Sequence, residues 1–589
     1  MQSRFVRVEN AHLMNHKPKL YIHINLLLIL CLIISFSGCK HQKDENPKQN
    51  IQDNWYRNPL IYNLDVDVFK DSDGDGIGDF NGLTQKLDYI DSLGVKVIWL
   101  APFQPTSDQD DGYDITDYYG VDKRLGTAAD FRRFMTEAKK RGLRIIMDAV
   151  LNHTSIDHPW FRSSRKDSTS KYYSWYVWSS TKPKDWDKGM VFPGTQTETW
   201  TYDEINKKYY FHRFYDFQPD LNYENREVKE EAFKVLQYWL KQGMDGFRLD
   251  AVPFIVDIPR TGSANPDHLF NILTELRNAV RKIKPDALLL GEANVTAKEN
   301  EEYFGKDGER LQMMFNFYAD QLLFYALAKG EPAAFSKALE DFRQKPPSSQ
   351  WAFFLRNHDE IDLGRLSKSQ RQAVYDKFGK ETNMQLYERG IRRRLAPMLS
   401  DPDLIKMSYS VLFSLPGAPV IRYGEEIGMG DDLTLLERLS VRTPMQWNNL
   451  SMAGFSTGKT TFRPVISLGE YGYDKINVSK ESSDSTSLLT YIKGLAKLRE
   501  QHPEIGLGNW KILTVDANPV LVIQYFYMDK NLIAVHNFSK EPQQFSLDKQ
   551  LMNDFHLKMV HGQTGSTQQD ESKFAIPGYG AQWYVASKK

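Results

Sequence analysis

The chain has 589 residues, of which 41% are hydrophobic and 13% aromatic, and it carries 75 lysines and arginines against 76 aspartates and glutamates. A chain of this length exceeds one ordinary domain and predicts two to four. The even charge balance argues against a generic nucleic-acid or membrane-surface binder. We therefore expect a globular protein with a large apolar core.

The first 39 residues have the pattern of an export signal. A basic leader precedes the apolar run Leu26–Ile34, which is too short to span a bilayer and suits the core of a signal peptide. The small residues before Cys39 resemble the lipobox of a bacterial lipoprotein, which implies that Cys39 is lipidated and becomes the mature N-terminus. An uncleaved signal anchor is the alternative. Residues 40–53 are polar and predict a flexible tether, so we expect an exported protein, lipid-anchored to a bacterial membrane and facing the periplasm or the cell surface.

From Trp55 onward, apolar runs alternate with amphipathic helical patterns. Eight such runs occur in chain order: "PLIYNLDVDVF", "VKVIWLAPF", "LRIIMDAVL", "GFRLDAV", "ALLLGEANV", "MMFNFY", "WAFFLRN" and "PVIRYGEE". Runs that are apolar throughout and separated by helices indicate a parallel sheet covered on both faces. Eight repeats predict an α/β fold, a closed (β/α)₈ barrel over residues 54–484.

Two segments depart from this alternation. Residues 154–222 form a long aromatic and polar stretch after the third run, and we interpret them as a subdomain inserted over the barrel mouth. After residue 485 the helical patterns fade and alternating runs such as "VLVIQYFY" appear. Residues 485–589 are therefore expected to form a C-terminal antiparallel β-sandwich domain.

Polar side chains follow four of the apolar runs, where a barrel of this kind places its active site. They are Asp148 and His153 after the third run, Arg248 and Asp250 at the fourth, Glu292 at the fifth, and His358 and Asp359 at the seventh. A structural ion pair would explain any one of them. Carboxylates from four strand ends gathered in one mouth repel each other, which favours a functional site.

The spacing of Arg248 and Asp250 predicts their chemistry. Residues two apart on a strand share a face, roughly 6–7 Å from each other. Arg248 should therefore lower the pKa of Asp250 and keep it ionised as a nucleophile, whereas Asp250 and Asp359 should raise the pKa of Glu292 and keep it protonated. Two carboxyls with different pKa values, one ionised and one protonated, are the catalytic groups that a retaining glycosidase needs.

Four segments, "DAVLNH", "GFRLDAV", "LLGEANV" and "FLRNHDE", resemble in order and spacing the signature regions of the α-amylase family, glycoside hydrolase family 13. The resemblance extends from Trp55 to the C-terminus. It implies that Asp250 is the nucleophile, Glu292 the acid/base and Asp359 the transition-state stabiliser. The residues that it implies grip the sugar are Asp148, His153, Arg248 and His358.

Further segments narrow the branch. "QPDLN" is similar to the fifth signature region of oligo-1,6-glucosidase-like members. "GYDITDY" supplies Tyr113 and Asp114, and "VRTPMQW" supplies Arg442. In that branch the aspartate and the arginine close off the far end of the site and hold a terminal glucose, which implies exo action on short α-glucosides.

Several stretches most resemble the trehalose synthase branch, whose members interconvert maltose and trehalose. Two features depart from it: those members are usually cytoplasmic, and "LTLLERLSVRTPMQW" lacks the usual charged run. Isomerase and exo-α-glucosidase therefore both stay open, because they share a glycosyl-enzyme and differ in what attacks it. A cell-surface endo-α-amylase acting on starch and a catalytically inactive binding or scaffold homologue are the alternatives. Arg442 with Asp114 argues against the first, and the intact acids argue against the second.

The stretch "DSDGDGIGD" has the spacing of an EF-hand-like calcium loop without its distal glutamate. The predicted ligands of a structural Ca²⁺ are Asp71, Asp73, Asp75, Ile77 and Asp79. Resemblance to trehalose synthases implies a second calcium site at Asn152, Asp220 and Asp257, where the shorter Asp257 replaces a glutamate. We expect no organic cofactor and no nucleic-acid partner, and the sequence leaves the oligomeric state open.

Overall fold

The computed structural model describes residues 55–256, 269–562 and 573–589. The predicted export signal, the tether and Cys39 lie outside the described residues, so these features stay predictions. Asp257 lies outside them as well. Within the described ranges, no helix combines the length and the apolar character needed to cross a membrane.

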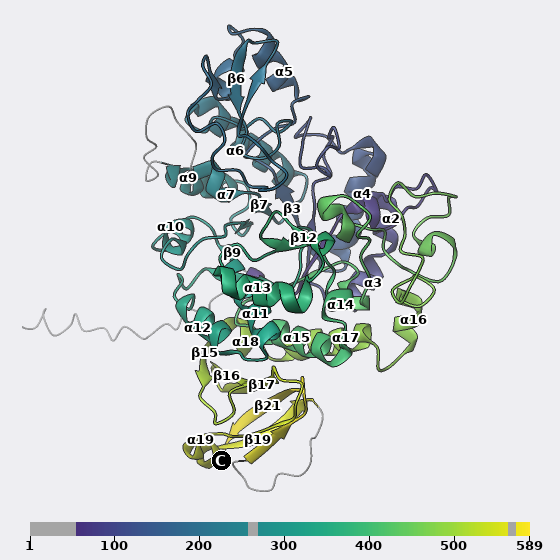
Figure 1. Cartoon of the computed structure of the whole chain (residues 1–589), viewed down its shortest axis with the longest axis vertical. Coiled ribbons are helices and arrows are strands. Elements are labelled where there is room, and N and C mark those ends of the chain that lie inside the picture. The colour runs from purple at the N-terminus through teal and green to yellow at the C-terminus, as the bar shows by residue number, and fades with distance from the viewer. Residues whose placement is uncertain (1–54, 257–268, 563–572) are drawn as a thin grey trace, which may run out of the picture. The chain divides into compact units, whose positions relative to one another are not determined.

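Eight parallel strands form a closed barrel in the order β1-β14-β10-β9-β8-β7-β3-β2 (Figure 1). Their bounds are β1 Ile61–Leu64, β2 Val97–Leu100, β3 Arg144–Ala149, β7 Gly246–Leu249, β8 Leu288–Gly291, β9 Met313–Phe315, β10 Gln350–Phe354 and β14 Ala418–Arg422. Each of the eight predicted runs overlaps one of these strands. The predicted (β/α)₈ barrel is thus confirmed.

Both faces of the barrel strands are buried, which explains why the runs are apolar throughout. Inward-pointing side chains such as Ile61, Val97 and Trp99 form a core inside the barrel. Their neighbours along the strands, such as Tyr62 and Ile98, pack outward against the helices. Alternate side chains of a strand point to opposite faces, so one strand serves two cores.

Helices cover the outside of the barrel and occupy the connections between its strands. The longer ones are α4 Ala128–Lys140, α6 Arg226–Lys241, α9 Asn271–Arg281, α11 Phe317–Lys329, α12 Ala333–Asp341, α13 Lys368–Phe378, α15 Pro402–Ser414 and α17 Leu488–Gln501. Helix α4 shows how the sequence specifies them. Thr127 and Asp130 form a capping box at its start, and Phe131, Phe134 and Ala138 are its buried stripe.

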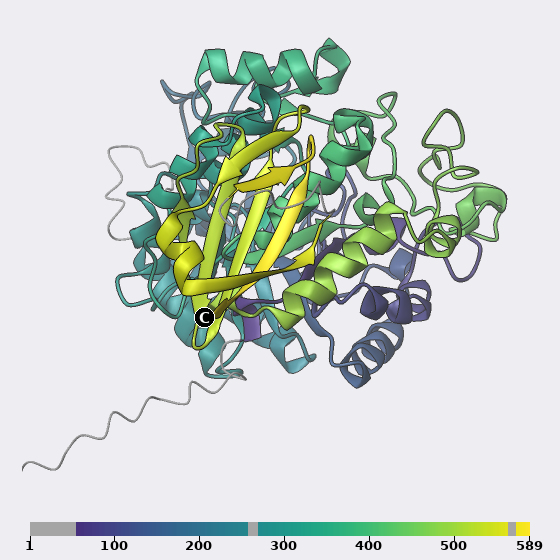
Figure 2. The same ribbon diagram turned by 90° about the horizontal axis from the view of Figure 1, so that it is seen from below.

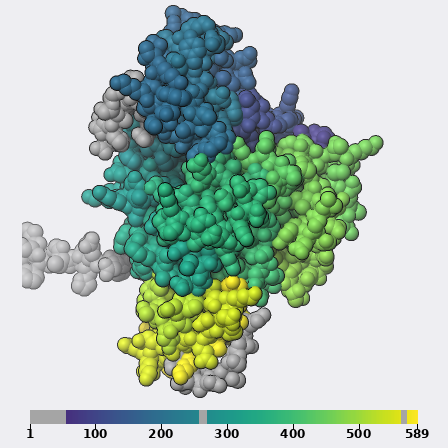
Figure 3. Space-filling view, viewed as in Figure 1, coloured from purple at the N-terminus to yellow at the C-terminus, as the bar shows by residue number. Residues whose placement is uncertain are grey.

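The third connection carries the inserted segment. It contains helix α5 Pro159–Lys166 and a small sheet of order β4-β6-β5, made of Trp178–Ser179, Lys208–Phe211 and Trp200–Asp203. Phe161 packs against Trp178 and Tyr210, with ring centroids 5.6 and 5.2 Å apart. The aromatic richness of this stretch therefore builds a separate small core. In the space-filling view its blue surface adjoins the green surface of the later barrel connections (Figure 3).

The C-terminal region contains two antiparallel sheets, as predicted. Five strands pair in the order β15-β16-β17-β21-β19 and two more, β18-β20, lie in a second sheet (Figure 2). Their bounds are β15 Asn509–Leu513, β16 Val520–Tyr527, β17 Lys530–Asn537, β18 Gln543–Ser546, β19 Phe555–His561, β20 Lys573–Ile576 and β21 Ala581–Lys588. A core that includes Val522, Ile533 and Phe545 lies among these strands.

The expected domain boundary at residue 485 is too early. Helix α17 follows that point and buries Leu489, Ile492 and Leu495, and it packs beside α15 of the barrel. The alternating strand pattern begins only at Asn509. The barrel's helical layer therefore extends to Gln501, where α17 ends, and the short helix α18 Glu504–Leu507 that follows contacts strands β15, β16 and β17.

Candidate active site

The predicted acids converge at the carboxyl ends of neighbouring barrel strands. The strand register places Asp148 of β3 beside Arg248 of β7, and Arg248 beside Leu290 of β8. Asp250 comes directly after β7, and Glu292 comes directly after β8. With Asp359, both line a cavity of about 800 Å³. A cavity of this size accommodates a small oligosaccharide.

Arg248 binds three carboxylates rather than one. Its guanidinium lies 3.0 Å from Asp148, 2.6 Å from Asp250 and 2.7 Å from Glu292. Only 1% of its surface is exposed, and it packs over the ring of Trp99. The two opposite charges on one buried strand are thus explained, since a single planar cation neutralises and aligns carboxylates from three strands.

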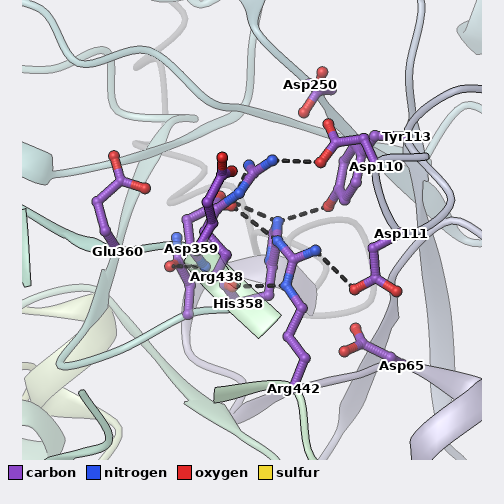
Figure 4. Close-up of polar contacts among 12 residues, drawn as sticks. Asp65, Asp110, Asp111, Tyr113, Asp250, His358, Asp359, Glu360, Arg438 and Arg442 are labelled. Atoms are coloured by element: carbon purple, nitrogen blue, oxygen red, sulfur yellow. Dashed lines mark hydrogen bonds and ion pairs between the residues drawn. The ribbon is translucent and has the colours of Figure 1, made fainter. Parts of the chain in front are cut away.

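Asp359 is held by two arginines and a histidine, which Figure 4 labels beside it. Arg438 and Arg442 contact its carboxylate at 2.9 and 3.1 Å, and His358 lies 3.1 Å away. Burial opposes ionisation of Asp359, but His358 and the two guanidiniums hold its pKa well below the usual range. Asp359 is therefore a permanent negative charge at the rim.

The order of the pKa values agrees with the sequence analysis, but the reason differs for Asp250. Burial raises the pKa of Asp250 to about 6, although Arg248 acts to lower it. The expectation of a depressed value is wrong, because removal of water outweighs the adjacent cation. Burial also raises the pKa of Glu292 to about 7, and the charges of Asp250 and Asp359 add to the rise.

These values predict a narrow pH optimum. A nucleophilic Asp250 must be ionised, so activity should fall below about pH 6, and an acid Glu292 must be protonated, so activity should fall above about pH 7. A profile of kcat/KM against pH checks both limbs. In Glu292→Gln, assayed with an aryl α-glucoside whose leaving group needs no proton, the alkaline limb should vanish. Persistence of that limb would contradict the assignment.

Three other predicted sugar-binding residues lie in or beneath the cavity. His153 and Tyr113 line it, and His153 bonds through Nε2 to the carbonyl of Tyr113 at 3.0 Å. Burial lowers the pKa of His153 to about 4, so it is neutral at pH 7. Asp148 is fully buried and accepts a hydrogen bond from the Tyr113 hydroxyl at 2.8 Å. Tyr113 also stacks on His358.

Asp114 does not close the far end of the site. Its carboxylate accepts bonds from the Thr106 hydroxyl and from the backbone of Gln109 and Asp110, and the side chain is completely buried. Its three local donors aim it into its own loop, so Asp114 is a turn-forming residue. Arg442 likewise points away from it, to Asp111 and Asp359.

The residues that border the far end are Asp110 and Arg438, which sequence reasoning missed. They form an ion pair at 2.5 Å and both line the cavity (Figure 4). Two signals in the sequence could have found them. Asp110 directly precedes "DGYDITDY", and Arg438 lies four residues before Arg442 in "LTLLERLSVRTPMQW".

Aromatic side chains from distant segments meet over the site. Phe192 of the inserted segment packs against Tyr215 and Tyr387, with ring centroids 4.8 and 4.6 Å apart. The hydroxyls of Tyr215 and Tyr387 both donate to Glu437, at 2.5 and 2.7 Å. We call Phe192, Tyr215, Tyr387 and Glu437 the aromatic bridge, because these residues join the inserted segment to later barrel connections.

The acidic loop brings together three of its five predicted ligands. Oxygen atoms of Asp71, Asp73 and Asp79 lie within 4.8 Å of one another. Backbone N–H groups of Gly74 and Gly76 bond to the buried Asp71. Three carboxylates with hard oxygen donors at this separation fit a Ca²⁺-like ion, and Asp75 and the main chain of Ile77 in the same loop are the remaining candidates. The cation stays a prediction.

Chelation should therefore destabilise the protein without stopping the chemistry. An ion that binds only the folded loop adds stability by mass action, so EDTA should lower the Tm by about 3–6 °C, and Ca²⁺ should restore it. Asp73→Asn should abolish this response, whereas Asp185→Asn, at an exposed acid elsewhere, should keep it. Differential scanning calorimetry checks the shift. An unchanged Tm for the wild type would contradict the cation.

Two of the three residues predicted for a second calcium site also meet. The side chain of Asn152 donates to Asp220, and burial raises the pKa of Asp220 to about 7. The third, Asp257, lies outside the described residues. The pair by itself is satisfied as a hydrogen-bonded contact, and the second site stays a prediction.

The fold and the site define an α/β-barrel enzyme that acts on glycosidic bonds: paired carboxyls with raised pKa values face one cavity, beside a third that stays ionised. Residues 64–391 and 392–508 match the family described as Alpha amylase, catalytic domain. The chain belongs to the α-amylase family, which confirms the resemblance. It is an α-glucoside-acting hydrolase or transglucosidase of the retaining kind.

Several curated proteins are similar over most of the chain. The Trehalose synthase/amylase TreS of Mycolicibacterium smegmatis is 37% identical over 90% of this chain and 92% of its own length. The Trehalose synthase of Thermus thermophilus is 39% identical over 84% of this chain, which spans 51% of that longer protein. The Oligo-1,6-glucosidase of Parageobacillus thermoglucosidasius is 31% identical over 84% of this chain and 92% of its own length.

Solved structures agree with the fold. Trehalose-6-phosphate hydrolase of Bacillus licheniformis superposes with a TM-score of 0.73 at 25% identity, covering 91% of this chain and all of that one. The α-amylase from H. orenii gives a TM-score of 0.73 at 28% identity, covering 90% of this chain and all of that one.

Proposed function

We propose that this protein transfers glucose between hydroxyls of short α-glucosides and interconverts maltose and trehalose through a glucosyl-enzyme at Asp250. The proposal is supported by relatives named trehalose synthase at 37–39% identity and by the enclosure of the site. The runner-up is an exo-α-glucosidase, which the relative named oligo-1,6-glucosidase favours. Both use the same first step.

In that first step the carboxylate of Asp250 attacks the anomeric carbon of the terminal glucose. A bond forms between Asp250 and that carbon, the bond from the carbon to the bridging oxygen breaks, and Glu292 gives its proton to that oxygen. The Asp359 carboxylate stabilises the positive charge that develops on the glucosyl ring. Free glucose and a β-glucosyl-enzyme result.

In the second step Glu292, now a carboxylate, takes a proton from an incoming hydroxyl. The oxygen of that hydroxyl bonds to the anomeric carbon and Asp250 leaves as a carboxylate. The anomeric hydroxyl of the retained glucose gives trehalose, its 4-hydroxyl gives maltose, and water gives glucose. The neutralisation of Asp250 in the first step removes one of the charges that raise the pKa of Glu292, so the loss of its proton is compatible with its second role.

The observation that carries the proposal is closure at two sides of the cavity. The ion pair of Asp110 and Arg438 borders the far end, where a longer glucan would have to continue in an endo-acting enzyme. Phe192 and Tyr387 of the aromatic bridge line the cavity beside Arg438, whose guanidinium lies 5.0 Å from the centre of the Phe192 ring. Walls on these two sides favour retention of the released glucose near the glucosyl-enzyme, where it competes with water.

The deciding experiment is incubation with maltose alone and with trehalose alone, followed by separation of the products. We expect each disaccharide to yield the other, with a minority of glucose. Glucose as the only product from both would make the protein an exo-α-glucosidase, and turnover of long starch alone would make it an endo-amylase.

Loosening the aromatic bridge should shift the products toward glucose. Tyr387→Phe removes the hydroxyl's bond to Glu437, worth about 1.5–3 kcal/mol as a bond to a charged group, and its bond to the Tyr215 hydroxyl. It should raise the glucose-to-disaccharide ratio several-fold. Tyr375→Phe is the matched control, because within the described residues the Tyr375 hydroxyl has no hydrogen-bond partner. Equal ratios in both variants would show that the bridge does not control water.

The proposal also takes the protein to be exported and lipid-anchored through Cys39 and to bind a structural Ca²⁺ at Asp71, Asp73 and Asp79. The support for the anchor is the amino-acid sequence, and the support for the ion is the grouping of three carboxylates.

A further inference from the structure

A buried row of alternating charges runs from Asp359 in the site toward the acidic loop. Arg442 donates to Asp359 at 3.1 Å and to Asp111 at 2.7 Å. Arg463 then binds the other oxygen of Asp111. The row is therefore Asp359, Arg442, Asp111 and Arg463, and Figure 4 shows its first three members.

Arg463 comes from outside the barrel strands. It is the last residue of an irregular segment, residues 455–463, that lies on the acidic loop. The backbone N–H of Asp71 bonds to the carbonyl of Phe455 at 3.1 Å, and that of Phe462 bonds to the carbonyl of Gly76 at 3.1 Å. The side chain of Arg463 is nevertheless only 8% exposed. It thus reaches inward from the segment to the row.

Arg463 makes two contacts that bear on Arg442. Besides Asp111, it donates to the backbone carbonyl of Arg442 at 3.1 Å. Arg442 in turn donates through Nε to the carbonyl of His358, at 2.9 Å, the residue next to Asp359. Arg463 therefore holds the main chain of Arg442, and it also holds Asp111, the carboxylate to which the Arg442 guanidinium binds.

Asp111 links the two arginines of the row. Burial acts to raise the pKa of Asp111, but Arg463 and Arg442 lower it and keep the carboxylate ionised. Its side chain is 7% exposed, and its backbone has a φ of 53°, which is unusual for a residue other than glycine. Without Arg463, the whole charge of Asp111 would fall on Arg442. Arg442 would then be drawn from Asp359 toward Asp111, and the carboxylate opposite Glu292 would move.

We propose that Arg463 is a positioning residue, which sets the place of Asp359 in the transition state through Asp111 and Arg442 without touching substrate. The inference rests on the proposed role of Asp359. Because the row holds an acid that acts during glucosyl transfer, a displaced Asp359 lowers the rate of the chemical step more than it weakens ground-state binding.

The experiment compares kcat and KM of Arg463→Met, Arg463→Lys and the wild type on p-nitrophenyl α-glucoside and on maltose, from rates measured over a range of substrate concentrations up to saturation. Arg463→Met should lower kcat by up to about 10²-fold. Its KM should stay within about threefold of the wild-type value, a difference of about 0.7 kcal/mol. Arg463→Lys keeps a cation beside Asp111, so its kcat should be at least about a third of the wild-type kcat.

Lys70→Met is the matched control for a general loosening of the segment. Lys70 donates to the carbonyls of Gly454 and Phe455 and does not contact the row. It should lower the Tm and leave kcat of the folded protein unchanged. Equal losses of kcat in Lys70→Met and Arg463→Met would overturn the proposal, because a general loosening of residues 455–463 would then explain both losses.

A double substitution isolates the route. In an Asp111→Asn background, Arg463→Met should cause less than about a twofold further loss of kcat, because residues that act through one another are not additive. The same fold loss in both backgrounds would overturn the proposal. Asp359→Asn separates this failure from that of the proposed function: if Asp359→Asn keeps full kcat, the role of Asp359 is wrong, and if it does not, only the route through Arg463 is in question.

Discussion

Asp250→Asn is expected to lower kcat on every α-glucoside that the wild type turns over by at least about 10⁴-fold, because an amide neither attacks the anomeric carbon nor leaves as a stable anion. The residue next to it supports this expectation. Arg248 contacts Asp250 at 2.6 Å and keeps its oxygen aligned, so the asparagine should occupy the same place. The measurement is kcat on maltose and on p-nitrophenyl α-glucoside.

The control for the loss of kcat in Asp250→Asn is a measurement that the variant still folds. Loss of one negative charge beside Arg248 leaves Asp148 as its charged partner at 3.0 Å, and the contact with Glu292 at 2.7 Å still holds the guanidinium in place. The Tm should therefore change by only a few degrees, and the variant should still bind maltose in calorimetry. Turnover within tenfold of the wild type would show that Asp250 is not the nucleophile.

Glu292→Gln offers a second, graded comparison. With maltose, whose leaving oxygen needs a proton, the loss should approach that of Asp250→Asn. With an aryl α-glucoside, whose leaving group departs without a proton, the first step should be much less affected. The rate loss on this substrate should be smaller than the loss on maltose by about 10²-fold or more. An equal loss on both substrates would assign Glu292 a role other than proton transfer.

Asp110→Asn should lower kcat/KM for maltose by about 10²- to 10³-fold. Asp110 and Arg438 form a nearly buried ion pair at 2.5 Å, so the substitution leaves the Arg438 guanidinium without its charged partner. Arg438 also contacts Asp359 at 2.9 Å. The unpaired guanidinium would therefore turn to Asp359 while the terminal glucose loses its acceptor at the far end.

Asp114→Asn is the informative comparison for Asp110→Asn. The Asp114 carboxylate is satisfied inside its own loop, so its substitution should lower the Tm while KM for maltose changes by less than about threefold, or about 0.7 kcal/mol. Steady-state kinetics and thermal unfolding of both variants check the pair. A large rise in KM for Asp114→Asn with none for Asp110→Asn would return the role to Asp114.

The acid–base assignment illustrates how far local reasoning reaches. Spacing along one strand placed Arg248 beside Asp250, and the structure has that contact. The same spacing implied a lowered pKa for Asp250, whereas burial raises it to about 6. Burial depends on everything packed around the carboxyl, including segments far away in the sequence. A two-residue argument therefore names the partner and misses the sign of the net shift.

The far end of the cavity shows the same division. Asp110, Asp111 and Asp114 lie within five residues, as do Arg438 and Arg442, and the sequence offers no rule for pairing them. The structure pairs Asp110 with Arg438 and Asp111 with Arg442. It also adds Arg463 to Asp111. These choices follow from where three irregular loops meet, and loop geometry is set by tertiary contacts.

The sequence alone determined the eight-stranded barrel, the strand ends that carry the acids and the family, because apolar runs and short motifs are local and each run specifies its own strand. The tertiary structure decided which arginine serves which aspartate, where the helical layer ends, and how the aromatic bridge covers the site. These depend on residues far apart in the chain, such as Asp111 and Arg463, which are 352 positions apart. Their energies come from shared burial and charge, which only the folded arrangement brings together.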